Sequence, residues 1–492
     1  MQRDKLQFEL LALVGVLEHQ EAEDSVNMAS TRISRTQTGG NRTTWTWSGW
    51  IKRGGRISNG THTLFNALDG SDTHCVRINS DDTLDFHYYS ATSGWLGRLN
   101  TYKKFFDVSS WYHIVAVWDS TNVTANDRMK LYVNGEEITE FGARTNPSSS
   151  LDGIVNDNTK VLYIGDKGDG GEYFDGSMSH VCFVDGTALA PSAFGSYDST
   201  DGIWKINTSP SVTYGTNGYY LKFEDSSNLD LDSGTNALTF TTAGNLMANK
   251  DNPSNNLCSV NWQARGMVDT TADSNHNCGY TVLIQQSSFR ANVGTLPVSA
   301  GKWYGEFKLR TATGTSGYAG MGVLNINPNP GDMSAQDPIR IGTYGNGVSY
   351  LSDGSVAKGN STVRTDSTFT AGDIISIAMD LDNGFIYWAK NGTWENSGDP
   401  TSGATGTGGY AISNILETGS AGGTDPGSYV MGVTGRVGGS SAPYFDINFG
   451  NGWYNTTAIG SPNADGNGYG AFSYAVPSNY LTICTKNIST NG

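Results

Sequence analysis

The sequence predicts an all-β protein made of two antiparallel β-sandwiches, preceded by a short N-terminal helix. Three features support this prediction: 63 of the 492 residues are glycine, only 16% are charged, and 12 Trp, 24 Tyr and 18 Phe are available for burial. Glycine usually makes up about 7% of a protein, so its share here is close to double. Coiled coils are richer in charged helix formers and disordered chains are poorer in aromatics. A turn-rich β protein fits all three features.

The N-terminal segment predicts an amphipathic helix over residues 6–17, because its apolar residues recur at helical spacing. Glu9 interrupts this stretch and no small-residue cleavage site follows, which disfavours a secretory signal. The stretch is also too short to span a membrane. We therefore expect residues 1–29 to be an anchor that packs on its own β domain or docks on a partner chain. The residues proposed for oligomerisation or docking are Leu6, Leu10, Leu13, Val14 and Leu17.

From residue 41 the hydrophobic pattern changes to a period of two. TWTWSGWIKR (44–53) alternates large and small side chains, which predicts a strand with one buried face. Asn134-Gly135 lies between two apolar runs and predicts a type I′ hairpin turn. Further strands are expected in WYHIVAVWD (111–119), KLYVNGEEI (130–138), VLYIGD (161–166) and SMSHVCFVDG (177–186). These elements predict a first sandwich over residues 30–223.

A polar stretch, residues 224–257, predicts a connection laid over the surface. A second sandwich with a C-terminal tail is expected over 258–492. Residues 397–441 are rich in Gly, Ser and Thr and predict long loops. The strands of this block are expected in GKWYGEFKLR (301–310), in GDIISIAMDLDNGFIYWAKNGTW (372–394), with turns at Asp382-Asn383-Gly384 and Asn391-Gly392, and in PYFDINFGNGWY (443–454).

Charge and cysteine content exclude some functions. The 31 basic and 47 acidic residues leave a net charge of −16. This diffuse acidity disfavours a nucleic-acid partner, which would require a basic stripe. The five cysteines are widely spaced and contain no CxxC pair, so neither a zinc site nor a disulfide framework is expected. We expect buried thiols in a protein made in a reducing cytoplasm.

Motifs for catalysis are missing from the sequence. No ExDxxE triplet provides the paired carboxylates of a jelly-roll glucanase, and neither GxSxG nor HExxH occurs. His113 and His180 lie within predicted strands, where a histidine is usually structural. We therefore expect no enzymatic activity, although a site assembled from distant residues stays open.

Two kinds of binding site remain as candidates. Asp166, Asp169 and Asp175 lie in GDKGDGGEYFDG (165–176), whose carboxylates and free carbonyls could hold calcium. The spacing is not that of an EF-hand, and Asp-Gly is also ordinary turn chemistry. Aromatic side chains in polar contexts could stack on a sugar or on a partner protein, or they could instead fill the sandwich cores. These aromatics are Trp95, Trp394 and Trp453.

The first block resembles the concanavalin A-like, laminin-G and pentraxin group of sandwiches. This resemblance implies glycan binding through rim loops, sometimes with calcium. It suggests Asp166 and Asp169 near such an ion and Tyr173 as a rim aromatic. The residues that carry the resemblance are TWTWSGWIKRG (44–54), WYHIVAVWD (111–119), MKLYVNGEEIT (129–139) and YIGDKGDGGEYFDGSMSHVCFVDG (163–186).

The second block resembles a SPRY domain, and this resemblance implies protein binding through loops. The residues that carry it are GKWYGEFKL (301–309), GYAGMGV (317–323), GDIISIAMDLDNGFIYWAKNGTW (372–394) and FDINFGNGWY (445–454).

The whole arrangement resembles structural proteins of tailed bacteriophages, through DNPSNNLCSVN (251–261) and GAFSYAVPSNYLTICTKN (470–487) in addition to the two blocks. This resemblance implies a non-enzymatic virion protein, displayed on a tail or tail fibre, that binds a host surface glycan or protein. Its expected partners are other virion proteins and further copies of itself, with a trimer as one arrangement; neither nucleic-acid binding nor membrane insertion is expected. The alternatives are a purely structural capsid, head-fibre or decoration protein, and a glycan-degrading tailspike.

Overall fold

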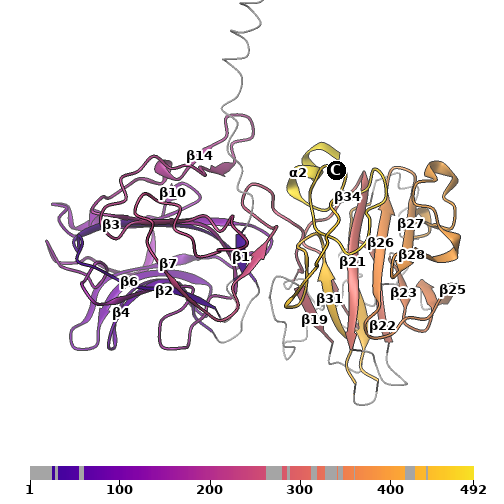
Figure 1. The fold of residues 1–492 in the computed structure, drawn as a ribbon, viewed down its shortest axis with the longest axis horizontal. Coiled ribbons are helices and arrows are strands. Elements are labelled where there is room, and N and C mark those ends of the chain that lie inside the picture. Colours follow the sequence, from indigo (N-terminus) through magenta and orange to yellow (C-terminus); the bar gives the residue numbers. More distant parts are fainter. Residues whose placement is uncertain are drawn as a thin grey trace, which may run out of the picture.

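The structure is a computed structural model of the 492-residue chain. It describes residues 25–27, 31–54, 60–261, 280–284, 289–311, 318–326, 341, 347–358, 361–415, 427–438 and 441–491. The helix predicted over residues 6–17 lies outside the described residues. Figure 1 shows two β-sandwiches side by side, the first in indigo to magenta and the second in orange to yellow. The all-β prediction is confirmed.

The first sandwich consists of two antiparallel sheets. Sheet A has the order β10 (Glu136–Glu137), β9 (Met129–Val133), β8 (Tyr112–Asp119), β3 (Thr44–Arg53), β13 (Gly176–Asp185), β1 (Ser25–Asn27) and β18 (Met247–Asn249), with β16 (Tyr219–Leu221) paired to β13. Sheet B has the order β11 (Phe141–Thr145), β7 (Gly94–Lys104), β6 (Thr83–Ser90), β5 (Asp72–Ile78), β4 (His62–Asp69), β12 (Val161–Ile164), β2 (Arg32–Thr36) and β17 (Thr241–Ala243).

Aromatic side chains fill the space between these two sheets. Trp45 and Trp118 stack with their ring centroids 6.5 Å apart, and Phe65 and Phe86 pack against Trp45 at 5.7 and 5.6 Å. All four rings are fully buried. Each aromatic of this size removes about 150–250 Å² from water, so this cluster dominates the stability of the first core.

Strand β3 corrects the prediction of a strand with one buried face. Every residue of β3 after Thr44 is buried, because a further layer covers the outer face of sheet A. That layer comes from the chain after β13, including the hairpin of β14 (Gly195–Tyr197) and β15 (Trp204–Ile206). Its apolar contacts join sheet residues to the layer above them: Val115, Val117, Cys182, Val184, Phe194, Tyr214 and Tyr220.

The connecting segment 224–257 is more deeply integrated than its polar composition predicts. Its strands β17 and β18 extend sheets B and A by pairing with β2 and β1. Beyond them, the Asp251 carboxylate accepts hydrogen bonds from Lys52 Nζ at 2.6 Å, from Trp111 Nε1 at 3.0 Å and from Tyr280 OH at 3.4 Å. Lys52 and Trp111 belong to the first sandwich and Tyr280 to the second, so one buried carboxylate joins both.

The second sandwich also has two main sheets. Sheet C has the order β19 (Tyr280–Leu283), β31 (Tyr444–Asn448), β21 (Lys302–Thr311), β26 (Ile374–Asp380), β27 (Phe385–Lys390) and β28 (Thr393–Trp394), with β29 (Tyr410–Ala411) paired to β27 and β34 (Leu481–Thr482) to β21. Sheet D has the order β20 (Arg290–Val293), β30 (Tyr429–Arg436), β22 (Tyr318–Asn325), β23 (Gly347–Leu351), β24 (Ser355–Lys358) and β25 (Ser361–Thr365).

Short elements complete the described chain. Strands β32 (Trp453–Tyr454) and β33 (Thr457–Ala458) form a small hairpin, and helix α2 (Thr485–Asn491) follows β34. Five single turns of 3₁₀ helix are η1 (Ala125–Asp127), η2 (Pro191–Ala193), η3 (Glu395–Ser397), η4 (Gly403–Thr405) and η5 (Ile412–Ile415).

The prediction of long loops over 397–441 is wrong for the part that forms β30, a buried central strand of sheet D. Two glycines of sheet D are paired in register, Gly322 on β22 and Gly432 on β30. A Cβ atom added at either position would lie 2.1 or 2.3 Å from a carbonyl oxygen of the next strand. These glycines therefore permit close strand packing, a role that composition does not distinguish from a loop.

The three predicted turns are confirmed, since β26 and β27 pair across Asp382-Asn383-Gly384 and the two Asn-Gly pairs have hairpin geometry. Asn134 and Gly135 have φ angles of 51° and 83°, and Asn391 and Gly392 have 49° and 80°. Positive φ at both central positions is the type I′ geometry, and it suits the twist of the flanking strands.

The C-terminal tail covers sheet C through the buried Glu306 of β21. Its carboxylate accepts hydrogen bonds from the backbone N–H groups of Ser473 and Tyr474 at 2.8 and 2.9 Å, and from Tyr454 OH at 2.7 Å. Tyr304 OH and Asn448 Nδ2 also donate, at 3.1 and 3.3 Å. Burial raises the pKa of Glu306, partly offset by these donors. The carboxylate thus holds the tail against its sheet.

The described cysteines, Cys75, Cys182, Cys258 and Cys484, are buried free thiols, as predicted. Cys278 lies outside the described residues. Within the part of the chain that the structure describes, no helix has the length and apolarity needed to cross a membrane.

Candidate functional site

The outer face of sheet B carries a row of polar side chains that crosses all eight of its strands. Residues such as Phe86, Val76 and Phe65 point inward to the core. Because side chains alternate along a strand, their neighbours point outward. The strand register places these neighbours opposite one another in what we call the polar row: Thr145, Arg98, His87, Cys75, Asn66, Tyr163, Ser34 and Thr241.

A loop formed by residues 165–175, the covering loop, folds over one half of this row. Asn66 Nδ2 donates to the Lys167 carbonyl at 2.6 Å, and the Thr63 N–H donates to the Glu172 carbonyl at 2.9 Å. Gly168 has a φ of 105°, and a Cβ there would lie 2.5 Å from the Tyr163 ring. Glycine is therefore required for the loop to approach the sheet this closely. The middle of the row is buried although it faces away from the core.

Trp95 borders the other half of the row. Its side chain on β7 is 39% exposed, and the Arg98 guanidinium lies over its ring, 4.1 Å from the centroid. Tyr89 and His87 contact it edge to face at 4.9 and 5.2 Å. Three neighbours thus hold the indole in one orientation while part of it faces solvent. A fixed, partly exposed aromatic with polar groups beside it is suited to stack on a ligand.

A continuous series of ion pairs runs from beneath Trp95 to the covering loop. Arg98 pairs with Asp85 at 3.0 Å, and Asp85 pairs with Arg77 at 3.4 Å. Arg77 also pairs with Glu172 at 3.4 Å. Lys167 pairs with Glu172 at 3.7 Å and with Asp169 at 2.9 Å. The series alternates in sign and its charges compensate one another, so it orders the surface without giving it a strong net charge.

Burial raises the pKa of Asp85, but hydrogen bonds and charge interactions with His87 and Arg98 more than offset this and hold its pKa below the usual value. Burial has the opposite effect on a histidine, and it lowers the pKa of His87. Its neutral ring donates from Nδ1 to Asp85 at 3.1 Å and accepts at Nε2 from the Thr73 hydroxyl at 3.2 Å. Asp85 is therefore ionised and His87 neutral at pH 7.

The order Asp85, His87, Thr73 is that of an acid–base–nucleophile relay in hydrolases, with Thr73 in the place of the nucleophile. Here both Thr73 and His87 are buried, and Trp95 lies against the His87 ring. The relay therefore acts in this structure as the support that fixes Trp95. The carboxylates of Asp85 and Glu172 are likewise not arranged as a glycosidase pair, because Arg77 lies between them and pairs with both.

A second histidine contact is also structural. Ser48 Oγ lies 2.8 Å from His113 Nε2, while Trp204 Nε1 donates to His113 Nδ1 at 3.0 Å. An indole nitrogen only donates, so Nδ1 accepts and Nε2 carries the hydrogen. His113 therefore donates to Ser48 and cannot take its proton. The imidazole is stacked between Trp50 and Trp204, and burial lowers its pKa to about 3.

The three predicted calcium ligands do not converge. Asp166 is buried and pairs with Arg32 at 3.3 Å, and Asp169 is exposed and pairs with Lys167. Asp175 is half-buried at the end of the covering loop. Among the described residues, no group of three or more His, Cys, Asp or Glu side chains is placed to hold a metal ion. Calcium at this position stays a prediction that these side-chain positions do not favour.

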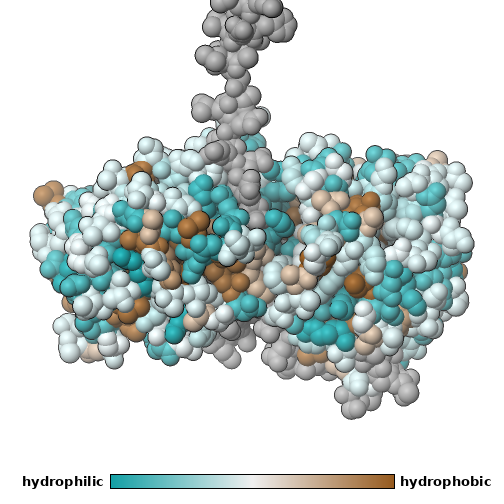
Figure 2. All heavy atoms as spheres, viewed as in Figure 1, coloured by the Kyte–Doolittle hydropathy of each residue, from teal (hydrophilic) through white to brown (hydrophobic). Residues whose placement is uncertain are grey.

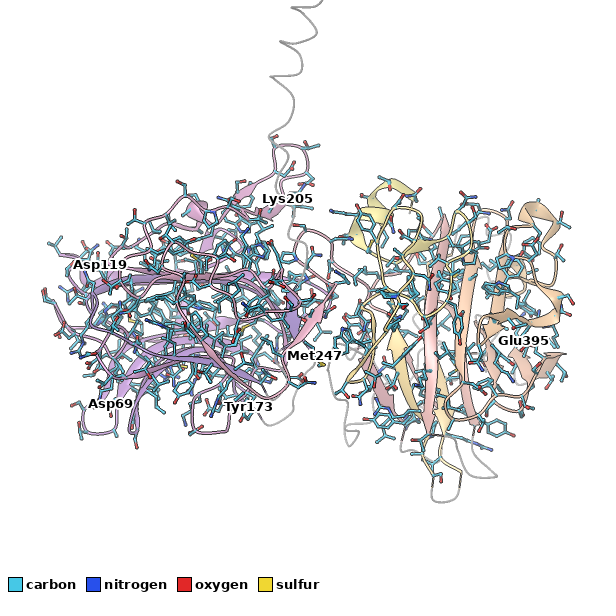
Figure 3. The ribbon with its side chains drawn as sticks, viewed as in Figure 1. Asp69, Asp119, Tyr173, Lys205, Met247 and Glu395 are labelled. Carbon is cyan, nitrogen blue, oxygen red and sulfur yellow. The ribbon has the colours of Figure 1, made fainter. Side chains whose placement is uncertain are left out.

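The predicted aromatic ligands lie in different places. Figure 3 places Tyr173, which belongs to the covering loop, on the far side of sheet B from sheet A, and its side chain is half-buried. Trp394 packs against Tyr387 in the second sandwich, with ring centroids 6.4 Å apart. Trp453 donates its indole N–H to the Ala248 carbonyl at 2.8 Å, which ties the second sandwich to β18. The predicted docking leucines, with Val14, lie outside the described residues.

Sequence reasoning missed most of the polar face. Arg98, Asp85 and Glu172 were not among the predicted site residues. The alternation Asp85, His87, Tyr89 on β6 was a usable signal, since three polar or amphipathic side chains share one face of an otherwise apolar strand. Figure 2 shows hydrophobic residues only in scattered small areas on the visible face.

A known family model matches part of the first sandwich. Residues 24–193 match the family model of the concanavalin A-like lectin/glucanases superfamily, laminin G type. A native heptameric SAP-like pentraxin from Limulus polyphemus is 17% identical, with 46% of this chain and 94% of that chain covered and a TM-score of 0.31. Among curated proteins, none matches the chain.

Two further solved structures are similar at the same level. A protein from Bacteroides ovatus described as carbohydrate binding is 18% identical, covers 46% of this chain and 60% of its own, and has a TM-score of 0.32. The SPRY domain of human HERC1 is 13% identical, with 39% and 92% covered and a TM-score of 0.25.

Proposed function

We propose that this chain is a non-enzymatic carbohydrate-binding protein, and that its ligand lies on the outer face of sheet B against Trp95. The observation that carries the proposal is the indole itself: 39% exposed, stacked on Arg98 and fixed by Tyr89 and His87. A sugar offers an apolar C–H face to an aromatic ring and hydroxyls to neighbouring polar groups. The lectin/glucanase family model over residues 24–193 supports this reading.

The charge pattern of the face supports a neutral or weakly charged glycan. The ion pairs from Arg98 to Asp169 compensate one another, so hydrogen bonding and stacking dominate over attraction between net charges. The sequence contains none of the catalytic motifs considered above, and Asp85, Glu172 and His113 are held in ion pairs or hydrogen bonds with other side chains. Both observations support binding over hydrolysis.

We further propose that the protein is displayed on a bacteriophage virion, on a tail or tail fibre, and attaches to a host surface glycan. The two-block arrangement and the 470–487 segment support this placement through their resemblance to phage structural proteins. Several copies acting together would strengthen attachment even if each site is weak. Antibodies to the second sandwich, used to label intact particles in electron micrographs, test it. Labelled tails agree with the proposal, whereas labelled capsids favour the decoration-protein alternative.

A glycan-binding assay tests the function directly. The full chain and its Trp95→Ala variant are compared on a glycan array that includes polysaccharides from candidate host bacteria. We expect binding by the wild type and at least tenfold weaker binding by the variant, since an aromatic anchor at the centre of a binding site typically contributes more than about 1.4 kcal/mol. Tyr197→Ala is the matched control, because Tyr197 is 51% exposed on β14, over the opposite sheet. Release of reducing sugar by the wild type would instead support the tailspike alternative.

A further inference from the structure

A polar pocket of about 1080 Å³ opens in the C-terminal part of the second sandwich. Three segments line it: the loop around Asp465–Tyr469, the stretch leading to β34, and helix α2. Figure 1 places α2 and β34 together at one end of this sandwich, in yellow. None of the elements that line the pocket belongs to sheet B, so the pocket is separate from the polar row. Its volume is that of a site for a ligand of several hundred daltons.

A buried carboxylate gives the pocket a fixed shape. Asp465 accepts hydrogen bonds from the N–H groups of Asn467 and Tyr469, both at 2.9 Å, from the Thr482 N–H at 2.8 Å and from Asn487 Nδ2 at 2.8 Å. Asn467 Nδ2 also donates to Asn487 Oδ1 at 2.7 Å. The loop, β34 and α2 are thereby tied to one point. The pocket is therefore formed before any ligand arrives, which lowers the entropic cost of binding.

The lining specifies the chemistry of the ligand. Asp465 is the one acidic residue among the lining residues, and its oxygens are already engaged. Lys486 is the one basic residue there, and its ammonium lies over the Tyr469 ring, 5.3 Å from the centroid. Burial lowers the pKa of Lys486, so part of its hydration is already removed. The other polar side chains of the lining are amides and hydroxyls, including Asn479 and Thr490, which both donate and accept.

We propose that this pocket binds an acidic saccharide, with Lys486 facing the carboxylate of a uronic-acid unit and the amides and hydroxyls facing its hydroxyl groups. The chain would then carry two glycan sites of different charge preference, one on each sandwich. The inference does not depend on the function proposed for Trp95, because no residue is shared between the two sites.

Two glycines allow a matched test. An added Cβ at Gly466 or at Gly460 meets no atom within 4 Å, and neither glycine has a positive φ. Gly466 lines the pocket and Gly460 does not. Gly466→Phe therefore adds a large side chain at the lining of the pocket without straining the backbone, while Gly460→Phe adds the same side chain elsewhere. Both variants should keep the wild-type circular dichroism spectrum and melting temperature.

The probe is trigalacturonate, with maltotriose as the neutral trisaccharide, titrated calorimetrically into the full chain that carries Trp95→Ala to silence the first site. We expect trigalacturonate to bind, with affinity reduced at least tenfold by Gly466→Phe and by Lys486→Gln and unchanged by Gly460→Phe. Undetectable binding of trigalacturonate, or equal affinity in the folded Gly466→Phe protein, would overturn the proposal. Equal affinity for maltotriose, unaffected by Lys486→Gln, would overturn its preference for acidic sugars.

Discussion

Replacing Asp251 by Asn should destabilise the whole chain far more than an ordinary surface mutation, because it removes one charge from a buried pair. The side chains of Lys52 and Asp251 are 4% and 1% exposed, and their charged atoms are 2.6 Å apart. In Asp251→Asn the Lys52 ammonium keeps two neutral acceptors, Asn256 Oδ1 at 2.6 Å and the Leu257 carbonyl at 3.0 Å, but no opposite charge in this pair. Breaking a buried pair from one side costs about 3–5 kcal/mol.

The matched control is Asp69→Asn. Lys160 and Asp69 are also close, at 2.7 Å, but they are 30% and 50% exposed, so solvent screens the pair and the loss of stability should be small. Guanidinium denaturation of the full chain, followed by tryptophan fluorescence, measures the loss of stability in each of the two variants. Because Asp251 also contacts Trp111 and Tyr280, we expect the variant to unfold in two steps where the wild type shows one. If Asp251→Asn and Asp69→Asn lower the free energy of unfolding by the same amount, the buried Asp251 carboxylate is not what joins the two sandwiches.

Four further predictions concern single elements. Burial lowers the pKa of His113 to about 3, so this histidine stays neutral in the folded state. In the unfolded chain it becomes protonated below about pH 6.5. Its contribution to the free energy of unfolding is therefore complete above pH 6.5 and is lost as the pH falls, by about 3 kcal/mol between pH 7 and pH 4. Urea titrations at both pH values should show a smaller loss of stability in His113→Gln. An equal loss would contradict the lowered pKa of His113. Glu306→Gln should lower the free energy of unfolding by about 1–3 kcal/mol in a denaturant titration, although glutamine has a similar shape. The amide nitrogen cannot accept hydrogen bonds from the donors that share the carboxylate. An unchanged midpoint would show that the tail is held by other contacts. Gly135→Ala should lower the melting temperature, since φ is 83° and the new Cβ would lie 2.4 Å from the Trp204 ring; a rise would mean that the ring moves freely. Deleting residues 1–24, which leaves β1 in place, should dissociate oligomers in light scattering; an unchanged number of chains per particle would refute the anchor prediction.

Much of the fold was predictable because local patterns determine it. Alternation identified β3, β8 and β21, and the Asn-Gly pairs at 134 and 391 identified two turns whose geometry is set by neighbouring residues alone. The burial of both faces of β3 was not predictable. The layer over it begins after residue 186, and nothing in β3 itself distinguishes a face covered by its partner sheet from one covered by a later segment.

The candidate site was predictable only in part, because its contacts are long-range. Trp95 could be suggested from its polar context, but its support depends on pairing between β6 and β7. The series from Arg98 to Asp169 joins four separate segments of chain. The covering loop illustrates the same limit. Its Asp residues suggested a metal site, whereas two of them form ion pairs with Arg32 and Lys167.

The proposed function depends on a glycan that binds against Trp95. Calorimetric titration of the best array ligand into the wild type, Trp95→Ala and Tyr197→Ala proteins tests it most directly. We expect wild-type affinity in Tyr197→Ala and at least a tenfold loss of affinity in a folded Trp95→Ala protein. Equal affinity in all three proteins would contradict it.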